Sequence, residues 1–197
     1  MAIREAIDTQ IPYYLTEPQA TGLKKALADF ENSKPVDYFI NKYNDKMLQG
    51  DGWLGLELFE FSSGEKFVRK GVILSNSCDI SPENYRDVPS NILFSPLISL
   101  SRFRQKLEQS GLSNEQVDAK LNSIRKQLVT NIFYLPEGGE LNDECFALLD
   151  NVHTMPSNAF TKSQEKEKLF TLSMVGFYLF TFKLSIHFCR LHEEISR

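Results

Sequence analysis

The feature that most constrains the fold is a series of short apolar segments separated by turn residues. Aromatic and aliphatic residues dominate positions 53–61, a Ser-Ser-Gly-Glu turn follows at 62–65, and a second apolar segment covers 67–75. This order is typical of a β-hairpin. Three further strands are predicted, over residues 91–98, 131–135 and 145–155. Several short strands around turns indicate a small barrel or a sandwich.

Helical patterns precede these strands. Thr16 stands as a candidate N-cap before Pro18 and Gln19, which predicts a helix over residues 17–31. A second, shorter helix is predicted around Tyr38–Tyr43. The chain therefore begins with a predicted helical extension over residues 1–48.

A helical hairpin is predicted between the third and fourth strands. Ser101 is placed to cap its first helix, which Gly111 ends. Ser113 and Gln116 form a capping-box pattern before the second helix. Apolar residues follow at helical spacing, at Val117, Leu121, Ile124 and Leu128.

The predicted fold is a single α+β domain over residues 1–197. Its parts are the helical extension (1–48), barrel strands (50–100 and 130–160), the inserted helical hairpin (101–129) and a long C-terminal helix (164–195). A chain of this length can bury a core of its own, and its 42% hydrophobic and 24% charged residues are typical of globular proteins.

The charge of the chain limits its partners. A net charge of −4 argues against broad binding to duplex nucleic acid, which requires a basic face. Basic residues gather in the segment 101–135, which has a net charge of +3, whereas residues 136–163 have −4. A local basic surface is therefore expected on the inserted hairpin.

Several features predict a cytoplasmic location. The three cysteines are few and widely spaced, which favours a reducing compartment over a disulfide framework. The first residues lack the apolar core of a signal peptide. The apolar stretch 169–191 is interrupted by charge, and its longest uncharged run, 169–182, is shorter than the roughly 20 residues that a bilayer requires. A buried helix is predicted there, and no membrane association.

Reactive side chains follow the strand that begins at the basic pair Arg69-Lys70. The strand runs into Ser75-Asn76-Ser77-Cys78-Asp79, an arrangement in which a strand delivers functional groups to a loop. Cys78 is a candidate nucleophile with Asn76 and Asp79 orienting a substrate. The alternative is a small buried residue at a strand end, with Asp79 forming an Asx turn or a cap.

No metal or cofactor is predicted. Cys78, Asp79 and His153 lack the spacing of a zinc site. On a helix, His187 and His192 point about 140° apart, so that together with Cys189 they do not form one site.

Three segments resemble the MazF/PemK family of SH3-like-barrel toxins, the ribonucleases of toxin–antitoxin pairs. An arginine leads into a strand that ends near Leu-Ser at 69–75, a proline is followed by a hydroxyl residue at 95–99, and Asp-Asn-Val-His-Thr at 150–154 corresponds to the family's Asp-Gln-Ile/Val-Arg/Lys-Ser/Thr strand. The resemblance covers about residues 50–195 apart from the hairpin. It implies an SH3-like barrel in a divergent family member.

The resemblance also implies roles for individual residues. Metal-independent RNA cleavage needs a cation on the phosphate and proton transfer at the 2′-hydroxyl. Arg69 would hold the phosphate, Ser99 would supply the hydroxyl, and His153 would contact RNA or transfer protons. Lys70, together with the loop residues Asn76, Cys78 and Asp79, would bind substrate.

Two functions follow from these observations. The first is a MazF/PemK-like, RNA-binding endoribonuclease that acts on single-stranded RNA without a cofactor, forms a dimer and is held by an antitoxin-like protein. The second is a non-catalytic barrel that serves as a protein-interaction component of a bacterial stress or phage-defence system. The family's proline is Lys70 here. The acidic charge, and Ile98 in the place of the family's threonine, favour the second function, whereas Arg69, Ser99 and the order of the motifs favour the first.

Overall fold

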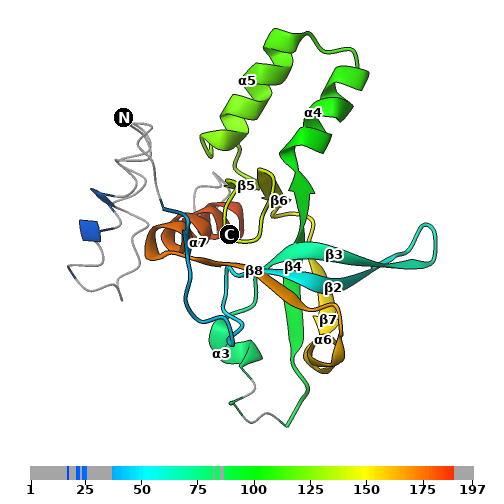
Figure 1. Ribbon diagram of the computed structural model, residues 1–197, viewed down its shortest axis with the longest axis vertical. Helices are drawn as coiled ribbons and strands as arrows, with labels where there is room; N and C mark the ends of the chain where they lie inside the picture. The colour runs from blue at the N-terminus through cyan, green and yellow to red at the C-terminus, as the bar shows by residue number, and fades with distance from the viewer. Residues whose placement is uncertain are drawn as a thin grey trace, which may run out of the picture.

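The computed structural model describes residues 37–188 apart from 82, 85 and 86, together with residues 17, 21, 22, 24 and 25. Most of the predicted helix 17–31, and the cysteine and histidine at 189 and 192, lie outside the described residues. The α+β class is confirmed (Figure 1).

Eight strands form one antiparallel sheet in the order β1-β8-β2-β3-β4-β6-β5, with β7 on β4. The strands are β1 (Phe39–Ile40), β2 (Gly52–Glu60), β3 (Glu65–Ile73), β4 (Asn91–Ser99), β5 (Ile132–Leu135), β6 (Cys145–Leu148), β7 (His153–Pro156) and β8 (Glu167–Leu172). Among the described residues β1 and β5 end this path and do not pair with each other, so the sheet is not closed into a barrel.

From β1 onward, the described residues form five helices beside the sheet. They are α3 (Ser77–Ile80), α4 (Leu100–Gln109), α5 (Asn114–Arg125), α6 (Ser157–Lys162) and α7 (Met174–Phe188). α4 and α5 lie in the predicted insertion and project together from the sheet (Figure 1). The capping box of Ser113 and Gln116 is present at the start of α5, as predicted.

Three predicted elements differ in the structure. The helix expected around Tyr38–Tyr43 is replaced by the short strand β1, which pairs with β8. The single strand 145–155 is two strands, β6 and β7, joined by a turn. The C-terminal helix predicted from residue 164 begins at Met174, because Glu167–Leu172 enters the sheet between β1 and β2.

The long hairpin of β2 and β3 forms an arm that extends from the sheet (Figure 1). A bulge shifts the register between Trp53 and Leu56, and Gly55 lies there with a φ of +88°. A Cβ at Gly55 would lie 2.9 Å from the Lys166 backbone, so both the conformation and the space require glycine. β2 pairs with β8 only at Gly52–Leu54, before Gly55.

Buried side chains form three clusters. One lies between the sheet and α7 and contains Phe133, Phe170 and Phe180; a second lies under β2, β4 and α6. The third joins the base of the α4–α5 hairpin to β5 and β6. The insertion is therefore fastened to the sheet by apolar packing at its base.

Candidate functional site

Ser99 ends β4 and is the N-cap of α4, the place that the sequence prediction assigned to Ser101. Its hydroxyl accepts a hydrogen bond from the Arg102 amide at 3.2 Å and donates one to the Asp143 carboxylate. Ser101 donates to the same carboxylate at 2.8 Å. The Ser99 hydroxyl is thus used in starting a helix and joining it to the β5–β6 connection.

The strand register places Arg69 and Ser99 on opposite faces of the sheet. Gly71 pairs with Pro96, so Arg69, two residues earlier, shares the face of Pro96 and Ile98. Ser99 follows Ile98 and projects from the other face, as does Lys70. Alternation along the two strands therefore separates the predicted phosphate-binding cation from the predicted hydroxyl.

His153 lies farther along β4. It pairs with Phe94, its ring is stacked on the Phe94 ring with centroids 5.8 Å apart, and Nε2 lies 3.0 Å from Asn151 Oδ1. Five residues separate Phe94 from Ser99, which corresponds to about 16 Å along a strand. The three predicted catalytic residues do not converge on one point.

Arg69 and Lys70 are both exposed. The Arg69 guanidinium lies 4.6 Å from the centre of the Phe67 ring and donates to the Val68 carbonyl. Burial, the largest effect, raises the pKa of the Cys145 thiol to about 11, and the positive charge of Lys70 partly opposes this rise. Lys70 therefore lies near the strand pair of Ser99 and Cys145, on the face away from Arg69.

The loop after β3 is held by its own polar side chains. Asn76 is the N-cap of α3, and its Oδ1 accepts from the Cys78 amide at 2.9 Å. The Ser75 hydroxyl accepts from the Leu93 amide at 2.8 Å, which ties the loop to β4. Cys78 and Asp79 are exposed, so the expected burial of Cys78 is wrong, and the cap is Asn76 rather than Asp79. Residues 69 and 73 are about 13 Å apart along β3, which separates this loop from Arg69.

A buried ion pair joins the turn before β2 to β8, and sequence reasoning did not find it. Lys168 Nζ lies 2.8 Å from Asp51 Oδ2 and donates to the carbonyls of Tyr43 and Lys46 at 2.6 and 2.7 Å. Only 1% of the Asp51 side chain is exposed. Burial raises the pKa of Asp51 to about 6, although Lys168 opposes the rise. The two residues are distant in sequence, and each has an ordinary local context, so no local signal identified the pair.

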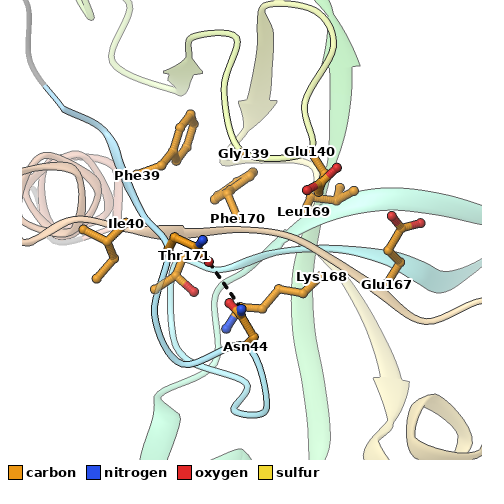
Figure 2. Close-up of a pocket in the computed structure, with 11 residues that line it drawn as sticks. Phe39, Ile40, Asn44, Gly139, Glu140, Glu167, Lys168, Leu169, Phe170 and Thr171 are labelled. Atoms are coloured by element: carbon orange, nitrogen blue, oxygen red, sulfur yellow. Dashed lines mark hydrogen bonds between the residues drawn. The ribbon is translucent and has the colours of Figure 1, made fainter.

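A cavity of about 610 Å³ lies beside this ion pair. Figure 2 shows the rings of Phe39 and Phe170 on one side of it, and Asn44, Lys168 and Thr171 on another. Within the described residues, three buried polar atoms near the pair have no hydrogen-bond partner: Asp51 Oδ1, Trp53 Nε1 and Thr171 Oγ1.

The charged groups of the ion pair beside the cavity are bonded to one another and to backbone carbonyls. The Lys168 ammonium has three hydrogen-bond donors, and the structure gives it three acceptors: the Asp51 carboxylate and the carbonyls of Tyr43 and Lys46. Over the described ranges, no three His, Cys, Asp or Glu side chains are grouped to hold a metal ion. The ion pair and these two hydrogen bonds fasten the 43–51 segment to β8.

No protein-family model matches the chain, and no curated protein matches it at a significant level. The described helices include none that is both long and apolar enough to cross a bilayer.

Proposed function

We propose that this chain is a non-catalytic, protein-interaction component of a bacterial stress or phage-defence system. The bacterial setting comes from the resemblance to toxin–antitoxin proteins. The observation that carries the interaction role is the apolar tip of the β2–β3 arm. Phe61 is 91% exposed and Phe59 49% exposed, with ring centroids 5.3 Å apart.

An aromatic pair at the end of a projecting hairpin is a typical anchor for a protein partner. Exposed aromatic rings cost solvation free energy that binding recovers, and aromatic residues are enriched at the centres of interfaces. Beyond the sheet, the α4–α5 hairpin presents a second projection with exposed basic side chains, among them Arg102, Lys106 and Lys120. A partner with an apolar pocket and acidic residues fits these two projections.

Capture from an extract of the source bacterium tests this proposal. Tagged wild type, Phe61→Ser and Val88→Ser are compared, since Val88 is also exposed, at 75%, but lies in the loop between α3 and β4. We expect a protein that is retained by wild type and Val88→Ser and lost from Phe61→Ser. Equal recovery with all three proteins would contradict a binding role for the arm tip.

The second candidate is the MazF/PemK-like ribonuclease with an SH3-like barrel. One observation favours it: the exposed Arg69 guanidinium lies against Phe67 next to Lys70, and arginine on an aromatic ring is suited to single-stranded RNA. The separation of Arg69, Ser99 and His153 favours the non-catalytic function over this one.

Cleavage of mixed-sequence single-stranded RNA in EDTA distinguishes the two candidates. Wild type, Arg69→Ala and Ser99→Ala are assayed after circular dichroism has shown each to be folded. We expect no cleavage by any of them. Cleavage by wild type that Arg69→Ala abolishes would overturn the non-catalytic proposal and assign the phosphate to Arg69.

A further inference from the structure

The outer edge of β3 has no strand neighbour over most of its length within the described residues. β2 pairs with β3 along the whole arm, whereas β4 pairs with β3 only at Gly71–Ile73. Figure 1 shows β3 leaving β4 as the arm extends. Along Glu65–Lys70 this edge has no strand partner among the described residues, and the Val68 carbonyl accepts from the Arg69 side chain. Another strand can pair with this edge.

The side chains along this edge are self-complementary. Glu65, Phe67 and Arg69 alternate onto one face, and the Arg69 guanidinium over the Phe67 ring agrees with this placement. Lys66 lies on the other face, where it forms an ion pair with Glu57 at 2.7 Å. One face of the edge therefore carries an acidic, an aromatic and a basic side chain in that order, at Glu65, Phe67 and Arg69.

An antiparallel pairing of two such edges about Phe67 brings opposite charges together. Glu65 then lies opposite the partner's Arg69, Phe67 opposite the partner's Phe67, and Arg69 opposite the partner's Glu65. Moving the axis to Val68 places Lys66 opposite the partner's Lys70. An axis between Phe67 and Val68 would oppose side chains from opposite faces, which an antiparallel ladder does not allow. Like charges opposed across a sheet destabilise it, so the axis at Phe67 is favoured over the axis at Val68.

We propose that a second copy of this chain pairs with the Glu65–Lys70 edge to form a two-fold symmetric, continuous sheet centred on Phe67. In this register Gly64 lies opposite the partner's Lys70, so each arm tip is directed at the fork between β3 and β4 of the other copy. The proposal does not depend on the function proposed above, since the oligomeric state is measured directly on the purified chain.

Sedimentation velocity on charge-exchanged variants tests the register. Glu65→Arg and Arg69→Glu each oppose like charges twice in the dimer, and we expect each to raise the dimer dissociation constant by about tenfold or more. The double exchange restores both opposite-charge pairs and the affinity. Lys120→Glu, which changes an exposed charge on α5, is expected to leave the dissociation constant unchanged.

A cysteine pair provides a second measurement. In a background of Cys78→Ser and Cys189→Ser, Phe67→Cys is expected to form an interchain disulfide rapidly under mild oxidation, because the two residues face each other at the axis. Val68→Cys faces the partner's Lys66 and is expected to cross-link much more slowly. Three results would each overturn the proposal. They are a wild type that stays monomeric at about 100 µM, a dimer that tolerates both single charge exchanges, and equal rates of cross-linking at positions 67 and 68.

Discussion

At the scale of single residues, the buried Lys183 has the clearest energetic consequence. It lies on α7 with 5% of its surface exposed and donates to the carbonyls of Gln127, at 3.0 Å, and Val129. These contacts fasten α7 to the segment between α5 and β5. Burial lowers the pKa of Lys183 to about 8, because the charged ammonium is less well solvated there.

The shifted pKa predicts a pH dependence of stability. Between about pH 8 and 10.5 the unfolded chain keeps the Lys183 proton that the folded chain has lost, so the free energy of unfolding rises with pH, by up to about 3 kcal/mol. Lys183→Met removes this rise. Urea unfolding of both proteins at several pH values from 7 to 10 measures the difference between them. Parallel curves would contradict the assigned titration.

At the scale of elements, the start of α5 was predicted correctly and the start of α4 was not. The Ser113–Gln116 box is recognisable from four consecutive residues. Ser101 was predicted as the cap of α4, but Ser99 is the cap, because its hydroxyl accepts from the Arg102 amide. The cap therefore lies two residues before the predicted one, and Asp143 accepts from both serines.

The two serines are expected to differ in their contribution to stability. Ser99→Ala removes both the cap of α4 and its hydrogen bond to Asp143, and we expect it to lower the free energy of unfolding by about 1–2 kcal/mol. Ser101→Ala leaves the cap in place and should cost less. Urea unfolding of the two variants, with Ser113→Ala as a reference cap, gives the comparison. A larger loss for Ser101→Ala would show that Ser101 is the cap after all.

Strands were harder to predict than helix caps. The apolar run after residue 168 suits a buried helix or a buried strand equally, and only its pairing with β1 and β2 makes Glu167–Leu172 a strand. The short strand β1 has two residues, too few for a periodic pattern, and exists because β8 offers it an edge. The β2–β3 hairpin, whose turn and strands are adjacent in sequence, was predicted correctly.

At the scale of the whole molecule, the local settings of the candidate site residues were easier to predict than their positions relative to one another. The sequence placed Arg69, Ser99 and His153 near strand ends, which is correct for Ser99 and His153, but their mutual positions follow from the register of β4 with β3, β6 and β7. The buried Asp51–Lys168 pair joins positions 117 residues apart and leaves no trace in either local segment. Neither the positions of the three predicted catalytic residues relative to one another nor the ion pair could be predicted from the spacing of residues in the sequence.

The capping box of α5, the β2–β3 hairpin with its turn, and the α+β class followed from the amino-acid order, because they depend on backbone preferences and contacts within a few residues. The open sheet, the opposite faces of Arg69 and Ser99, and the unpaired edge of β3 were decided by tertiary structure. The physical reason is that strand side chains alternate with a period of two, so a single step in pairing moves a residue to the other face. Pairing between distant strands is set by the packing of the whole core.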